Sequence, residues 1–176
     1  MVQWFRFQET PSKLVAWADS DYAACRSTRK STSGGCLMFG SHAIRTWSST
    51  QSVVALSVGE AEYSALVKAG CAALGLQSVA GDMGLSLEVE LNTDSSSAKG
   101  VAGRLGLGKT RHIAVHLLWL QEKARNQEVR IRKVPTSGNL ADLMTKIMDA
   151  NRTKQLLELM GCWFTEGQND TCPRLA

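Results

Sequence analysis

Acidic side chains stand near the ends of two segments that have the composition of β-strands. Residues 13–21 (KLVAWADSD) carry Asp19, and residues 87–94 (LEVELNTD) end in Asp94. Ligand sites in open α/β sheets lie beyond the carboxyl ends of the strands. The two aspartates are therefore candidates for one site, although a single aspartate at a strand end is usually a turn or capping residue.

Two further acids fall beside apolar positions of predicted helices. Glu62 is followed by Ala65 and Leu66 on the inner face of a long helical segment, and Asp142 lies within the string NLADLMTK. A carboxylate beside a buried face is costly unless a positive charge compensates it, and Mg²⁺ binds oxygen ligands while keeping several waters. The four acids together indicate a divalent-cation site, whereas Asp142 alone would be an ordinary first-turn acid.

The elements that must position these acids follow the order β-β-β-α-β-α-α-β-α. A tight turn at Gly40-Ser41 separates the second and third strands. Ser57, with Glu60 three residues on, predicts a capping box at the start of the long helix. This order indicates the α/β class, with a mixed five-stranded sheet and helices packed on it. The predicted strands are 13–21, 34–40, 42–49, 87–94 and 128–135, and the predicted helices are 57–84, 95–104, 110–126 and 137–160, the last with Asn139 as a cap.

The bulk properties suit one intracellular domain. The 176 residues carry a net charge of +4, which permits a phosphate-bearing partner without requiring one. Five cysteines, an odd number without a C-x-x-C pair, indicate reduced thiols in a cytosolic or nuclear protein. No apolar run approaches the roughly 20 residues of a membrane span. The first residues also lack the apolar core of a signal peptide.

Two other patterns compete with a cation site formed by acids. Residues 103–110 (GRLGLGKT) match the phosphate-binding sequence G-x-x-x-x-G-K-[ST] of P-loop NTPases. That loop works between a strand and a helix, but the preceding segment predicts a helix, so a Gly-rich loop between helices is favoured. His112 and His116 have the spacing of zinc ligands on a helix, yet no third ligand stands at a suitable spacing.

Six strings in the chain resemble the ribonuclease H domain of copia-type (Ty1/copia) retrotransposon Pol polyproteins. They are WADSDYA (17–23), RKSTSGGCLMFG (29–40), TWSSTQSVVALSVGEAEYSAL (46–66), TDSSSAKGVA (93–102), TRHI (110–113) and VPTSGNLADLMTK (134–146). They occur in the order of that family, and RKSTSG and LS-x-x-EAEY are the most distinctive. The resemblance implies a ribonuclease H-like fold. It divides the chain into an N-terminal extension (1–12), the ribonuclease H domain (13–147), and a C-terminal helical extension with an irregular tail (148–176).

The resemblance also assigns the four acids to catalysis and to metal binding. It implies that Asp19 bridges two Mg²⁺ ions, for which Mn²⁺ can substitute, that Glu62 and Asp94 hold the leaving-group side, and that Asp142 holds the water side. The implied reaction is hydrolysis of the RNA strand of an RNA–DNA hybrid, with the ions about 3.5–4 Å apart. The implied products carry a 3′-hydroxyl and a 5′-phosphate, and RNA is selected through its 2′-hydroxyls. The stretch before Asp142 lacks the histidine that many cellular relatives carry there and that is thought to help product release.

Basic residues in predicted loops or at helix ends are candidates for binding the phosphates of a hybrid. Together with Ser33 of the RKSTSG string, they are Arg26, Arg29, Lys30, Lys99, Arg104, Lys109 and Arg111. For any one of these cations an ordinary solvated surface position is an equally good interpretation.

The resemblance further implies a reverse transcriptase domain in the parent polyprotein as a partner. It implies a cytoplasmic location in a virus-like particle, or a nuclear one, with no membrane partner and no nucleotide cofactor. Two alternatives stay open. One is a hybrid-binding or polymerase-supporting domain with weak catalysis, and the other is a DNA-cutting, integrase-like nuclease with the same fold and acids.

Overall fold

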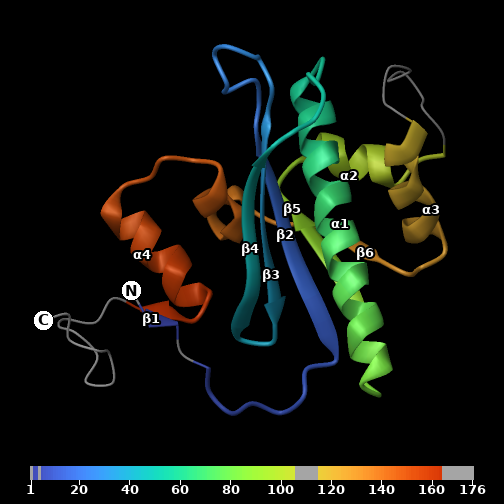
Figure 1. Cartoon of the computed structure of the whole chain (residues 1–176), viewed down its shortest axis with the longest axis vertical. Helices are drawn as coiled ribbons and strands as arrows, with labels where there is room; N and C mark the ends of the chain where they lie inside the picture. Colours follow the sequence, from blue (N-terminus) through green and yellow to red (C-terminus); the bar gives the residue numbers. More distant parts are fainter. Residues whose placement is uncertain (1, 4, 106–114, 164–176) are drawn as a thin grey trace, which may run out of the picture.

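A sheet of five strands forms the centre of the fold. The computed structural model describes residues 2–3, 5–105 and 115–163 (Figure 1). The strands of the sheet are β2 (Lys13–Asp21), β3 (Thr32–Phe39), β4 (His42–Thr50), β5 (Glu88–Thr93) and β6 (Arg130–Lys133). They lie in the order β4-β3-β2-β5-β6, with β2, β3 and β4 antiparallel and β5 parallel to both β2 and β6. The predicted mixed five-stranded sheet is confirmed.

One face of the sheet, the α1 face, is covered by three helices. They are α1 (Val58–Asp82), α2 (Ser96–Ala102) and α3 (Trp119–Arg125), the last preceded by a 3₁₀ helix at Val115–Leu118. Alternate residues of β2, Ala16 and Ala18, pack in this core with Ala65, Ala69 and Ala73 of α1, and all are almost completely buried. Small side chains on both elements let α1 lie close along the sheet (Figure 1).

The opposite face, the α4 face, is covered by later residues of the chain. A 3₁₀ helix at Leu140–Met144 and helix α4 (Ala150–Leu159) pack there, as the separation of α4 from α1 shows in Figure 1. Cys36 and Met38 of β3 lie in this second core with Leu156 of α4, whereas Leu37 between them belongs to the α1 face. Because successive strand residues point to opposite sides, this alternation means that both faces of the sheet are buried.

Helix α1 begins and ends at the signals that the sequence contains. The Ser57 side chain accepts a hydrogen bond from the Glu60 backbone N–H, and the Glu60 carboxylate accepts one from the Leu56 N–H at 2.7 Å. The helix stops just before Gly84, whose φ of +82° is readily adopted only by glycine. No helix in the described part of the chain combines the length and the apolar character needed to cross a bilayer.

The predicted helix at 137–160 is wrong as a continuous element. A 3₁₀ helix at Thr136–Gly138 and another at Leu140–Met144 come first, and α4 starts only at Ala150, where the Asp149 side chain caps it. The second 3₁₀ helix buries Leu140, Ala141 and Asp142 against the sheet, a close approach that interrupts regular α-helix. The predicted helix at 110–126 begins in the described residues as the 3₁₀ helix Val115–Leu118, and 110–114 lie outside them.

A second, two-stranded sheet joins the two ends of the described chain. Strand β1 (Val2–Gln3) pairs antiparallel with β7 (Cys162–Trp163). The Gln3 side chain donates to the Ala43 carbonyl oxygen, and the Ala43 N–H donates to the Met160 carbonyl at 3.4 Å. The prediction of an irregular tail after the C-terminal helical extension is therefore wrong at Cys162 and Trp163, because both pair with a strand from the other end of the sequence.

Candidate active site

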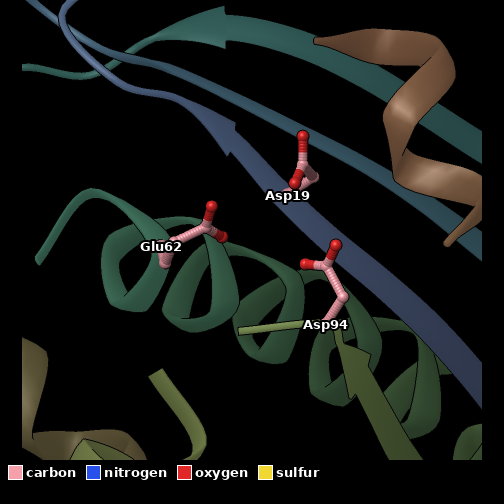
Figure 2. Close-up of side chains that lie close together, drawn as sticks. All are labelled: Asp19, Glu62 and Asp94. Atoms are coloured by element: carbon pink, nitrogen blue, oxygen red, sulfur yellow. The ribbon is translucent and has the colours of Figure 1, made fainter. Parts of the chain in front are cut away.

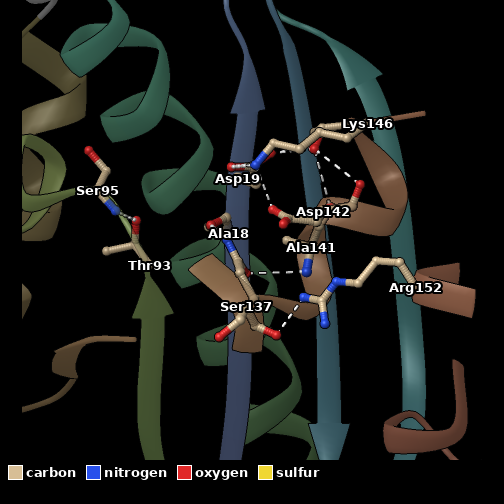
Figure 3. A network of polar contacts seen from close by, with 11 residues as sticks. Ala18, Asp19, Thr93, Ser95, Ser137, Ala141, Asp142, Lys146 and Arg152 are labelled. Atoms are coloured by element: carbon tan, nitrogen blue, oxygen red, sulfur yellow. Dashed lines mark hydrogen bonds and ion pairs between the residues drawn. The ribbon is translucent and has the colours of Figure 1, made fainter. Parts of the chain in front are cut away.

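Two aspartates lie at the same end of neighbouring parallel strands. In the β2–β5 register Ala18 is opposite Thr93, so Asp19 and Asp94 directly follow a matched pair. Asp94 is held between two anchored residues. The Ser95 N–H donates to the Thr93 hydroxyl at 3.1 Å, and the Ser95 side chain caps α2 by accepting from the Ala98 N–H (Figure 3). The predicted meeting of the two strand-end acids is confirmed.

Glu62 completes a compact group of three carboxylates. It projects from the second turn of α1, and the capped start of that helix fixes its direction toward β2. One carboxylate oxygen from each of Asp19, Glu62 and Asp94 lies within 4.8 Å of the other two (Figure 2). This is the only group of three or more metal-ligating side chains in the described ranges of the chain.

Asp142 joins this group through a lysine. Lys146 Nζ lies 2.7 Å from Asp142 Oδ1 and 3.3 Å from Asp19 Oδ1, so the ammonium bridges the two carboxylates (Figure 3). The Thr145 hydroxyl also donates to the Asp19 carboxylate. The structure thus brings all four predicted acids to one region, with Asp142 outside the three-carboxylate group itself.

The 3₁₀ helix that carries Asp142 is tied to the central strand by Asn139. The completely buried Asn139 side chain donates to the Ala18 carbonyl oxygen at 3.2 Å and accepts from the Ala141 N–H at 3.3 Å. The predicted cap is confirmed, and the bond to Ala18 places the helix next to Asp19. Gly34 on β3 permits this approach, because a Cβ there would lie only 2.5 Å from the Thr145 methyl carbon.

Burial and like charge shape the electrostatics of the site. Burial raises the pKa of Asp19, an effect opposed by the Thr145 hydroxyl and the Lys146 charge. Burial, followed by the charges of Asp19 and Asp94, raises the pKa of Glu62 to about 8. Glu62 Oε2 is also buried without a hydrogen-bond partner among the described residues. An orphaned carboxylate oxygen beside two further carboxylates fits a hard divalent cation, so the residues present match the metal that the sequence predicts.

The predicted phosphate-binding residues are placed in different surroundings. Arg26 and Arg29 are exposed in the loop that follows β2, where Lys30 is half-buried, and Lys99 is exposed on α2. Arg104 is half-buried just after α2. Lys109 and Arg111 lie outside the described residues.

Ser33 differs from these cations. Its side chain is only 3 % exposed, and its hydroxyl accepts a hydrogen bond from Gln51 Nε2 at 2.9 Å. The Ser33 side chain therefore forms a buried contact between β3 and the segment before α1. This burial argues against the prediction that Ser33 contacts nucleic acid.

The competing patterns gain no support from the described residues. The segment before Gly103 is helix α2, as predicted, so the strand that a P-loop requires is not there. Residues 106–110 of that string lie outside the described residues, as do His112 and the side chain of His116.

Sequence reasoning missed Lys146 and Thr145 as members of the site. Both fall within the string VPTSGNLADLMTK, and Lys146 follows Asp142 at the i, i+4 spacing that favours an ion pair on a helix. That spacing was a usable signal for the contact with Asp142. Nothing in the local sequence indicates the contact with Asp19, 127 positions away.

Two solved structures with a similar arrangement of strands and helices are ribonuclease H proteins. The N-terminal ribonuclease H domain of a Mycobacterium tuberculosis protein, solved as a fusion with maltose-binding protein, matches with a TM-score of 0.53 at 16% identity. The match covers 84% of this chain and 97% of that one. LC11-RNase H1, isolated from compost, matches with a TM-score of 0.51 at 20% identity, over 76% and 92% of the two chains. The fold is that of the ribonuclease H class.

Two proteins with similar sequences indicate the family to which the chain is related. The chain is 32% identical, over 150 residues and 84% of its length, to the retrovirus-related Pol polyprotein from transposon TNT 1-94 of Nicotiana tabacum. It is 45% identical over 53 residues, 30% of its length, to the uncharacterized mitochondrial protein AtMg00810 of Arabidopsis thaliana. The chain is a homologue of copia-type retrotransposon Pol polyproteins, and it spans 11% and 22% of the length of these two relatives. No protein-family model matches the chain.

Proposed function

We propose that the chain is a ribonuclease H that hydrolyses the RNA strand of RNA–DNA hybrids during retrotransposon reverse transcription. The observation that carries this proposal is the group formed by Asp19, Glu62 and Asp94, whose ligand oxygens lie within 4.8 Å of one another. The homology to a Pol polyprotein supports the biological setting, and the ribonuclease H fold supports the reaction class.

The four acids are proposed to hold two Mg²⁺ ions, or Mn²⁺ in their place. When bound, such ions supply an activated water and stabilise the leaving oxygen of the phosphodiester. The fold holds the carboxylates of the site in fixed positions. Asp19 and Asp94 stand at the ends of paired strands, and Glu62 stands on a capped helix, so the ligands need little reorganisation when the cations bind.

The exposed cations near the site are proposed to bind the phosphates of the hybrid. Arg26 and Arg29 lie in the loop that begins just after β2, and Lys99 lies on α2, the helix that Ser95 caps directly after Asp94. Phosphate contacts position a nucleic acid without reading its sequence. The preference for RNA is proposed to come from its 2′-hydroxyls.

The wider setting is also a proposal. The parent polyprotein is proposed to supply a reverse transcriptase domain that delivers the hybrid, and the homology to a retrovirus-related Pol polyprotein supports this. The protein is proposed to act inside the cell, in a cytoplasmic virus-like particle or in the nucleus.

A cleavage assay with a hybrid that carries a labelled RNA strand tests the function. We expect RNA cleavage that requires Mg²⁺ or Mn²⁺, that stops on chelation, and that is lost in the variants Asp19→Asn and Asp94→Asn. Asp21→Asn is the matched control, because Asp21 ends the same strand outside the carboxylate group.

Substrate comparison separates the alternatives. Cleavage of duplex DNA in preference to the hybrid would indicate an integrase-like nuclease. A gel shift of the hybrid by folded protein, without turnover in either metal, would replace the proposal with a non-cleaving binding domain.

A further inference from the structure

The ammonium group of Lys146 occupies the space between two of the four acids. It enters between Asp19 and Asp142, whose side chains are only 2% and 6% exposed, while its own side chain is 40% exposed. Figure 3 shows the ammonium reaching the two carboxylates from a position just after the 3₁₀ helix Leu140–Met144. The ammonium of Lys146 therefore lies beside the two carboxylates, while its side chain is partly exposed to solvent.

The Asp19–Asp142 half of the site and the Glu62–Asp94 half differ in how their negative charge is compensated. Within the described residues, both ion pairs of the site run from Lys146, one to Asp19 and one to Asp142. Asp19 gains a further donor from the Thr145 hydroxyl. On the other side, Glu62 retains a buried oxygen without a hydrogen-bond partner. Lys146 thus makes direct ion pairs with Asp19 and Asp142, whereas its charge reaches Glu62 only at longer range.

A carboxylate oxygen that accepts a close ammonium does not present the same space to a metal ion. Divalent cations bind carboxylate oxygens at about 2.0–2.1 Å in the case of Mg²⁺, which is closer than the ammonium stands. Loading a cation between Asp19 and Asp142 therefore requires Lys146 to withdraw. The partial exposure of the Lys146 side chain allows that movement without unfolding of the 3₁₀ helix Leu140–Met144.

We propose that Lys146 is a displaceable internal counter-ion that competes with the divalent cation of the Asp19–Asp142 half and so sets the metal concentration at which the second ion binds. The inference rests on the proposed metal site. It predicts sequential loading, with the Glu62–Asp94 side filled first and the Lys146 side filled at higher metal concentration.

Metal binding measured by calorimetry on the full chain tests this inference without any nuclease turnover. In Lys146→Met, the weaker Mg²⁺ site should bind about tenfold more tightly, the size of a typical coupling between two competing groups. The stronger site, which shares Asp19 but not Asp142, should change by less. Lys146→Gln should behave like Lys146→Met, Lys146→Arg should stay close to the parent protein, and Lys154→Met is the matched control on the exposed surface of α4.

Thermal unfolding gives a second readout. Without metal, Lys146→Met should unfold at a lower temperature than the parent, because two buried carboxylates lose their cation. Its midpoint should rise more steeply on addition of Mg²⁺, since tighter binding to the folded state stabilises it more. If Lys146→Met and Lys146→Gln bind both ions with the affinities of the parent, or more weakly, the inference is overturned.

The hybrid assay separates the two hypotheses. Cleavage by the parent protein with unchanged metal affinities in the variants would reject the role of Lys146 alone. Tighter metal binding in the variants, together with a parent protein that never cleaves a hybrid, would reject the proposed function and leave the role of Lys146 standing.

Discussion

The α1 face and the α4 face of the sheet are built differently, and the acid site lies where they meet. The α1 face presents Glu62 on a long helix whose alanines pack tightly on β2. The α4 face presents Asp142 on a five-residue 3₁₀ helix, together with Lys146 as its counter-ion. Asp19 belongs to the strand between them. The α1 face thus supplies a carboxylate whose position is fixed by helix packing. The α4 face supplies a carboxylate whose negative charge is balanced by Lys146.

The largest effect should come from the residue that both faces share. Asp19→Asn should lower hybrid cleavage by at least about 10²–10³-fold, the usual loss when one preorganised electrostatic group is removed. Asp142→Asn should cost less, because Asp142 stands outside the three-carboxylate group. Initial rates at saturating Mg²⁺ check this order. Equal losses for both variants would show that the two faces contribute alike.

Core truncations test the two faces as structural units. Leu66→Ala on the α1 face and Leu156→Ala on the α4 face remove completely buried side chains, so each should lower the free energy of unfolding by about 2–5 kcal/mol. Urea unfolding gives the totals. Hydrogen exchange should show that Leu156→Ala exposes α4 first while the amides of β2 and β5 stay protected. Simultaneous exposure of all these amides would show that the two faces form one cooperative unit.

The link between the faces is the Asn139 side chain. Asn139→Ala removes the side-chain bond to the Ala18 carbonyl oxygen and the bond from the Ala141 N–H, both buried, so the free energy of unfolding should fall by about 1–3 kcal/mol. Activity should fall as well, because the helix that carries Asp142 loses its attachment. Asn126→Ala, at an exposed position after α3, is the control and should change stability by less than about 0.5 kcal/mol.

Cysteine alkylation offers the smallest perturbation. The half-buried Cys25, with a pKa lowered to about 7 chiefly by the Ser27 hydroxyl, should react increasingly fast as the pH rises through 7 and then level off, because the thiolate is the nucleophile. Cys36 in the α4-face core, with a pKa raised to about 12 by burial, should stay unreacted in the folded protein. Peptide mass spectrometry follows each site. Labelling of Cys36 at the rate of Cys25 would mean that the α4 face opens readily.

The sequence predicts well where local pattern decides the structure. The segment 13–21, predicted as a strand that ends in acids, is strand β2 with the predicted bounds, and Ser57 with Glu60 gives the start of α1. The four acids are found because each lies in a string shared with a known family. What is missed depends on contacts between distant residues: the bridge from Lys146 to Asp19, the break before α4, and the pairing of β1 with β7.

The tie between Asn139 and Ala18 spans 121 positions of the chain, and this has a consequence for biosynthesis. The three-carboxylate group comes from residues up to Asp94, whereas Asp142 and Lys146 leave the ribosome later. Closing so distant a contact carries a large loop-closure entropy cost, which slows folding. The contacts of Lys146 with Asp19 and Asp142 can therefore form only after translation has passed residue 146, when the three residues of the carboxylate group have already been synthesised.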